Sequence, residues 1–123
     1  MYKKNKSEVI KKQTPGLISH ILLQKSEVDE SNLLLTWVEI EPGFNQPLHQ
    51  HQAEQAYIII QGNGEITVDK EKEAVTKGDI IYIPSNELHG ILNTGGTLLV
   101  YISASTPSFD ISKFYEATNF RKS

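Results

Sequence analysis

Three of the four histidines of this chain are spaced so that they could bind one metal ion together. His49 and His51 are two residues apart, so on an extended strand both side chains leave the same face. His89 could join them from another strand, and neutral imidazoles with one oxygen donor suit a divalent transition metal. Because the chain has no cysteine, the metal ligands must be nitrogen or oxygen atoms. His20 is interpreted as an ordinary surface or core residue.

These histidines lie in two segments that share a framework of glycine, proline and asparagine. The first segment follows the pattern G-x5-H-x-H-x3,4-E-x6-G, at Gly43, His49, His51, Gln55 and Gly62. The second follows the pattern G-x5-P-x-G-x2-H-x3-N, at Gly78, Pro84, Asn86, His89 and Asn93. Gln55 replaces the glutamate of the first pattern and Asn86 replaces a glycine of the second. The two segments resemble the two motifs of the cupin superfamily.

The resemblance implies a small single-domain cupin that binds one divalent transition metal: zinc, manganese, nickel or iron. It implies that the metal ligands are His49, His51, Gln55 and His89. Some small cupins that this chain resembles, among them polyketide cyclases and enzymes acting on unsaturated uronates, carry three histidines and a glutamine at these positions. Glu54 is the alternative to Gln55, but strand alternation places Glu54 on the opposite face. A neutral glutamine should leave the metal a stronger Lewis acid and lower its affinity somewhat.

The elements that must position these ligands are predicted to be strands. Short apolar runs rich in Ile, Val, Leu, Tyr and Thr are separated by turn residues, and Gly62-Asn63-Gly64 favours one tight reversal. We predict strands over 17–23, 33–41, 46–51, 55–61, 65–68, 74–75, 80–83, 88–92 and 97–103. This spacing predicts an all-β fold, and the resemblance makes it a double-stranded β-helix, the jelly-roll barrel of cupins.

The barrel is expected over residues 16–106, as a single domain of a chain of 123 residues. Residues 1–15, rich in lysine, are expected to form a partly flexible N-terminal arm. Residues 107–123 are expected to form a helical or irregular segment that packs outside the barrel. In that segment Asp110 could cap a short helix with Ile111, Phe114 and Tyr115 on its apolar side.

Aromatic side chains at strand spacing are candidates to line a substrate pocket. They are Tyr57, Tyr82, Tyr101, Trp37 and Phe44, with Ile91 beside them. Tyr57 is the strongest candidate, because it follows Gln55 by two residues on the same face. On the opposite face of that strand, Ala56, Ile58 and Ile60 form an apolar patch that, with the resemblance, favours a homodimer.

Charge and hydropathy exclude several classes of partner. The net charge is −3, from 12 basic and 15 acidic residues, so a dedicated nucleic-acid binder is not expected. Apolar runs are too short to cross a membrane and no secretory signal is evident, so we expect a cytoplasmic protein with a small-molecule ligand or substrate.

Three functions remain open. The first is a metal-dependent enzyme that uses Lewis-acid chemistry, as an isomerase, cyclase or lyase, on a sugar acid or cyclic ketone. The second is an iron-dependent dioxygenase. The third is a non-catalytic protein that binds a sugar or organic acid. Catalytic residues are not assigned, because the segment Tyr101-Ile102-Ser103-Ala104-Ser105 lacks the acidic and basic residues that the uronate enzymes have there.

Overall fold

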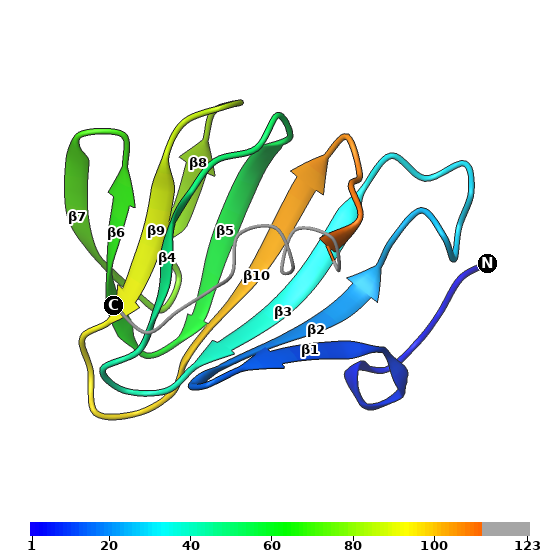
Figure 1. Cartoon of the computed structure of the whole chain (residues 1–123). Helices are drawn as coiled ribbons and strands as arrows, with labels where there is room; N and C mark the ends of the chain where they lie inside the picture. Colours follow the sequence, from blue (N-terminus) through cyan, green and yellow to red (C-terminus); the bar gives the residue numbers. More distant parts are fainter. Residues whose placement is uncertain (112–123) are drawn as a thin grey trace.

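The computed structural model describes residues 1–111, and ten strands form two antiparallel sheets in it (Figure 1). The six-stranded sheet has the order β1-β2-β3-β10-β5-β8 and the four-stranded sheet has the order β4-β9-β6-β7. The strands of the first sheet are β1 (Lys11–Thr14), β2 (Leu17–Leu23), β3 (Leu34–Ile40), β5 (Glu54–Gln61), β8 (Ile80–Ile83) and β10 (Leu99–Thr106). Those of the second are β4 (Asn45–His49), β6 (Asn63–Val68), β7 (Glu71–Thr76) and β9 (His89–Asn93).

The all-β prediction is confirmed, and the differences in strand bounds have local causes. The polar sequence of β1, a Lys-Lys-Gln-Thr run, lacks the apolar alternation that predicts a strand, yet it pairs with β2 along its whole length. A short 3-10 helix, η1 (Lys6–Glu8), precedes it and is capped by Asn5. The strand expected over 46–51 ends instead at His49, so His51 lies in the following loop. The last strand continues three residues beyond its expected end, to Thr106.

Two turns show why the framework residues are needed. Gly62 has φ +89°, and a Cβ atom there would lie 2.5 Å from the carbonyl oxygen of Leu98. Asn86, which stands where the cupin pattern has glycine, adopts φ +65°. After glycine, asparagine is one of the residues that tolerate this left-handed conformation best, so the replacement preserves the turn.

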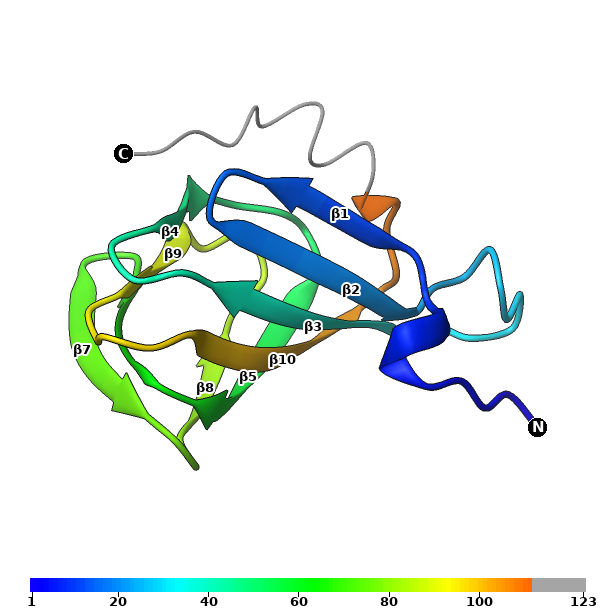
Figure 2. The same cartoon turned by 90° about the horizontal axis from the view of Figure 1, so that it is seen from below.

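The two sheets curve toward each other (Figure 2), and one apolar core lies between them. Its buried side chains come from both sheets and include Val38, Ile59, Ile66, Ile83 and Leu99. On β5 the alternation of buried and exposed residues follows the sequence prediction, because Gln55, Tyr57 and Ile59 are buried while Glu54 and Ile58 are exposed. Burying each aliphatic side chain contributes about 1.5 to 3 kcal/mol, so this pattern fixes the register of β5.

A second, smaller apolar cluster lies where the chain leaves β10. Ile111 packs there against Ile21 and Leu34, and Phe109 lies against the same cluster. The helix expected around Phe114 and Tyr115 falls outside the described residues. Within residues 1–111, no helix combines the length and apolar character needed to span a bilayer.

Candidate metal centre

The three histidines converge at one end of the barrel, and we call His49, His51 and His89 the histidine cluster. One ring nitrogen of each lies within 4.8 Å of the others. His49 and His89 are directly opposite each other on β4 and β9, and their ring centroids are 4.1 Å apart. His51 reaches the cluster from the loop after β4, with its ring centroid 4.9 Å from that of His89. The backbone N–H of Asn86 donates to the carbonyl of His51 and holds this loop in place.

A backbone carbonyl fixes the tautomer of each imidazole. Nδ1–H of His49 donates to the carbonyl of Pro47 at 2.7 Å, that of His51 to Ala53 at 2.9 Å, and that of His89 to Glu87 at 2.9 Å. Since a carbonyl can only accept, Nδ1 carries the proton and Nε2 keeps its lone pair. Such outer hydrogen bonds are the usual way to orient a metal-binding histidine.

The surroundings of the cluster keep the imidazoles neutral. Burial lowers the pKa of His49 to about 3, and the nearby His89 lowers it further in the same direction. Burial lowers the pKa of His89 to about 4, against a smaller opposite effect of the Glu87 carbonyl. Burial also lowers the pKa of His51, partly offset by its hydrogen-bond acceptors. At neutral pH the cluster therefore presents uncharged nitrogen donors, the form that binds metals.

Gln55 brings an oxygen donor from the other sheet. Its side-chain Nε2 donates to Oγ of Ser103 at 2.6 Å, which fixes the orientation of the amide. Its Oε1 is buried and has no hydrogen-bond partner in the described residues. Glu54 is exposed and instead accepts a hydrogen bond from Tyr82 at 2.7 Å. The structure thus brings Gln55, and not Glu54, to the inner face that the histidine cluster shares.

A divalent cation fits this donor set. Nε2 of His89 and Oε1 of Gln55 are both buried without a partner among the described residues. Leaving such atoms unsatisfied costs about 1 to 3 kcal/mol each, whereas a bound cation would accept both lone pairs. All four donors are neutral nitrogen or oxygen atoms, which suits zinc, manganese, nickel or iron(II) without selecting among them.

Beside the cluster lies a small cavity of about 20 Å³, which we call the histidine cavity. Hydroxyl and amide groups provide most of its polar lining, from Ser19, Thr36, Gln46, Gln55, Tyr57, Tyr101, Ser103 and Ser105. Tyr57 and Tyr101 both donate their phenolic hydroxyls to Oε1 of Gln46, at 3.1 and 2.8 Å. No Asp, Glu, Lys or Arg is among the described residues that line it.

Of the five aromatic residues expected at a substrate pocket, Tyr57 and Tyr101 line the histidine cavity and the other three lie elsewhere. Tyr82 is 59% exposed, because its register partner on β5 is the outward-facing Ala56. Trp37 also lies on the outer face, where its Nε1 donates to Glu39 and Lys6 lies over its ring. Phe44 and Ile91 pack in the apolar core and are not among the cavity residues.

The cavity is also lined by residues that were not predicted from the sequence, among them Gln46, Ser103, Ser105 and Phe109. Gln46 lies three residues before His49, and both turn inward because the β4–β9 register shifts between them. Ser103 and Ser105 continue the inward phase of Tyr101, a signal that was present in the alternation of β10. Phe109, whose ring centroid is 5.0 Å from that of His51, follows the last strand and gave no sequence signal.

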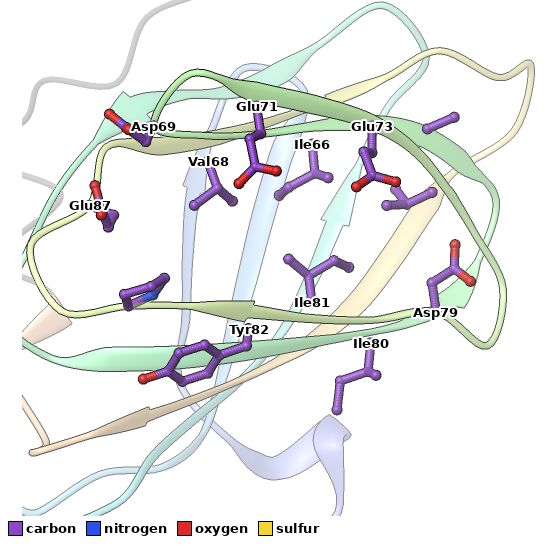
Figure 3. A pocket seen from close by; sticks show the side chains of 13 residues that line it. Ile66, Val68, Asp69, Glu71, Glu73, Asp79, Ile80, Ile81, Tyr82 and Glu87 are labelled. Atoms are coloured by element: carbon purple, nitrogen blue, oxygen red, sulfur yellow. The ribbon is translucent and has the colours of Figure 1, made fainter.

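A larger concave region lies elsewhere, between the edge strands β7 and β8, with a volume of about 540 Å³. Five carboxylates line it, from Asp69, Glu71, Glu73, Asp79 and Glu87, and we call it the acidic groove. Figure 3 shows Glu71 and Glu73 pointing across the gap toward Ile81, while Ile80 and Tyr82 point away from it. Within residues 1–111, no three of these carboxylates lie close enough together to hold one metal ion, and none joins a histidine in such a group.

Residues 36–105 match the family described as Cupin domain. An uncharacterised protein of Methanocaldococcus jannaschii is 43% identical over 63 residues, which are 50% of each chain, so this chain spans about half the length of that relative. An oxalate-binding protein of Thermotoga maritima is 29% identical over 102 residues, which cover 73% of this chain and 84% of the relative. The crystal structure of a predicted oxalate decarboxylase from Thermotoga maritima superimposes with a TM-score of 0.75 at 24% identity, and the match covers 84% of this chain and 96% of the other.

Proposed function

Because this chain belongs to the Cupin domain family, we propose that it holds one divalent transition metal on the histidine cluster and Gln55, and binds a small organic acid on that metal. The pair of buried atoms without a partner, Nε2 of His89 and Oε1 of Gln55, carries the metal part of the proposal. They come from different sheets and face the same cluster, so one cation satisfies both.

Charge supports an anionic ligand. Four neutral donors leave both positive charges of a divalent metal without compensation, and the histidine cavity offers no carboxylate among its described lining residues. A carboxylate would neutralise this charge in surroundings where water is largely excluded. The name of the Thermotoga relative, an oxalate-binding protein, agrees with a small acid as the ligand class.

Lewis-acid catalysis is the second candidate, and the two tyrosines favour it. The phenols of Tyr57 and Tyr101 both carry a proton and both line the cavity, with ring centroids 4.4 Å apart. A metal there would polarise a carbonyl or hydroxyl oxygen of a sugar acid or cyclic ketone. Because both phenols already donate to Gln46, proton transfer would first require one of these hydrogen bonds to break, which is why binding is the main proposal.

The test begins with metal-stripped protein. Manganese, zinc, nickel, cobalt or iron(II) at a hundred times its dissociation constant should stabilise the fold by about 2.7 kcal/mol, measured as a rise in melting temperature. Metal-loaded protein is then titrated with oxalate in a calorimeter, and it is assayed for conversion of oxalate, of a sugar acid and of a cyclic ketone. A melting temperature that no metal shifts would refute the metal site. Heat of binding without turnover supports the binding function, turnover under nitrogen supports Lewis-acid catalysis, and oxygen uptake by the iron form would instead indicate a dioxygenase.

We also propose that two copies pair through the outer face of the six-stranded sheet. Trp37, Ile102, Ile58 and Ile80 are successive register partners across four strands, and Ile58 and Ile80 are 43% and 70% exposed. An apolar row that crosses a sheet in this way is self-complementary in a two-fold pair. Light scattering should give twice the 13.8 kDa of one chain, and Ile58→Lys should halve the measured mass; a wild-type monomer would refute the pairing.

A further inference from the structure

The hydroxyl of Ser105 stands apart from the other polar groups of the histidine cavity. Ser105 is 1% exposed, and its Oγ is one of the three buried side-chain atoms without a hydrogen-bond partner among the described residues. The other two are the metal-facing atoms of Gln55 and His89. A cation explains those two, but a hydroxyl group that is also a donor requires an acceptor. Such a group indicates a ligand atom that the described chain does not itself supply.

The register of β5 and β10 places this hydroxyl beside the metal ligand from the six-stranded sheet. Ser105 is directly opposite Gln55, and Ser103 is directly opposite Tyr57. Directly opposed residues have Cβ atoms about 4.5 to 5.5 Å apart, and both serines face the cavity. Ser103 is already engaged by Nε2 of Gln55. The two serines therefore differ in role: Ser103 orients the metal ligand, whereas Ser105 faces whatever lies next to it.

The cavity also limits the size and chemistry of that ligand. Its volume of about 20 Å³ holds one or two water-sized groups, since one water needs roughly 10 to 15 Å³ by this measure. Phe109 lies over His51 and Ile111 completes the apolar wall. With no charged side chain among the described lining residues, recognition beyond the metal must come from neutral donors such as the Ser105 hydroxyl.

We propose that Ser105 donates its hydroxyl to an oxygen of a small carboxylic acid whose other oxygen is bound to the metal. This assigns Ser105 as a specificity-determining residue for the smallest carboxylates, and it rests on the proposed function. A carboxylate bound through one oxygen keeps a second, charged oxygen close by, and hydrogen bonds to charged acceptors are the stronger kind. Larger acids are disfavoured because the Phe109 side chain occupies the space they need.

The experiment compares wild type with Ser105→Ala, both loaded with manganese, in calorimetric titrations with formate, oxalate and succinate. Removing the donor should weaken formate and oxalate binding about tenfold, the size expected for one hydrogen bond to a charged group. Metal affinity should be unchanged, and the metal-free Ser105→Ala protein should melt at or above the wild-type temperature, because an unpartnered buried hydroxyl has been removed. Thr106→Ala is the control: it removes a hydroxyl from the next, partly exposed position of β10. It should leave the affinities for all three acids unchanged.

The outcomes separate this inference from the proposed function. If loaded wild type binds formate or oxalate and Ser105→Ala binds it equally well, the role of Ser105 is overturned while the metal-bound acid stands. If Ser105→Ala melts lower and loses metal, the hydroxyl is structural and the inference also fails. If loaded wild type binds none of the acids, both proposals fail. Phe109→Ala gives an independent check of the size limit, because it should improve succinate binding relative to oxalate; unchanged selectivity would contradict that limit.

Discussion

The histidine cavity and the acidic groove are both concave, and they differ in nearly every property that matters for binding. The groove is much larger, about 540 Å³ against about 20 Å³, and carries five carboxylates. The cavity is small and lined by uncharged groups, and among residues 1–111 the three buried side-chain atoms without a hydrogen-bond partner belong to this cavity or to the histidine cluster beside it. Selection by volume alone would have favoured the acidic groove, which does not contain the histidine cluster. Convergence of desolvated lone pairs indicates a site better than size does.

The groove has a structural explanation that the cavity lacks. β7 and β8 are the edge strands of their sheets, with unpaired backbone groups along one side. Glu71 and Glu73 share the inward face of β7 with the buried Val75. Inward-pointing charges on an edge strand oppose pairing with another chain, which is a known way to prevent aggregation. Edge protection therefore explains the carboxylates of the groove, but it does not explain the buried Gln55, His89 and Ser105 atoms that have no partner among the described residues.

The largest effect that separates the two regions should come from His89→Ala. Nε2 of His89 has no partner in the described structure, so the variant loses a metal donor and should lose most of the roughly 2.7 kcal/mol that saturating metal gives to wild type. Melting temperature with and without zinc measures this loss. Glu71→Gln in the groove is the matched control and should keep the full shift. An equal loss in both variants would mean that the metal-induced stabilisation does not arise at the cluster.

Lowering the pH should destabilise the metal-free protein, because the histidine cluster is buried in its neutral form. His49 has a pKa of about 3 in the fold and 6.5 when unperturbed, because burial opposes its charged form. Below about pH 6.5 the unfolded chain therefore binds more protons, and stability falls as the pH falls toward 3. Between pH 6.5 and about pH 5, the protonation of His49 in the unfolded chain should lower the free energy of unfolding by about 2 kcal/mol. Urea midpoints at these two pH values measure the loss, and His49→Gln should lose less; identical losses would mean that His49 is not buried in its neutral form.

A smaller effect on metal affinity is expected from substitutions of Gln55 and of its neighbour Glu54 on β5. Gln55→Ala should weaken metal retention about tenfold, because it removes the buried amide oxygen proposed as a metal ligand, which lines the same cavity as His49 and His51. Glu54→Ala should leave retention unchanged, since Glu54 is exposed and bonds to Tyr82. Competition with a chromogenic chelator gives both affinities. The reverse ranking would transfer the ligand role to Glu54 and show that β5 changes its phase when metal binds.

Strand alternation predicted the parts of the site that lie on regular strands. Gln55 and Tyr57 face inward as their spacing requires. Asn93 of the second motif is buried, and its side-chain amide N–H groups donate to the carbonyls of Ile40 and Thr97. A strand that is apolar throughout gives no phase, however. β8 reads Ile-Ile-Tyr-Ile, so only its register with β5 shows that Tyr82 faces outward. The sequence of such a strand does not show whether one face or both faces are buried, until its register with the neighbouring strand is known.

Other errors arose from irregular or distant structure. Trp37 points outward and Thr36 inward, because the buried Leu34, Val38 and Ile40 set the phase of β3. Lys6 of the N-terminal segment lies over the outward-facing Trp37 ring. Gln46 turns inward through a register shift that no spacing rule anticipates. Motif spacing thus predicted that the three histidines come together, whereas the lining of the cavity depended on contacts between segments far apart in the chain.

The smallest effect should come from the groove itself. Glu73→Gln removes one of the like charges on the inner face of β7, where Glu71 is its neighbour two residues away. Because both side chains are exposed, relief of repulsion should stabilise the fold by no more than about 0.5 kcal/mol, and less at high salt. Urea unfolding at two ionic strengths measures this change. Metal affinity should be the same as in wild type, since Glu73 is not among the residues of the histidine cavity. A loss of metal affinity in Glu73→Gln would show that the two regions are coupled through the barrel, and the groove could then no longer be explained as edge protection alone.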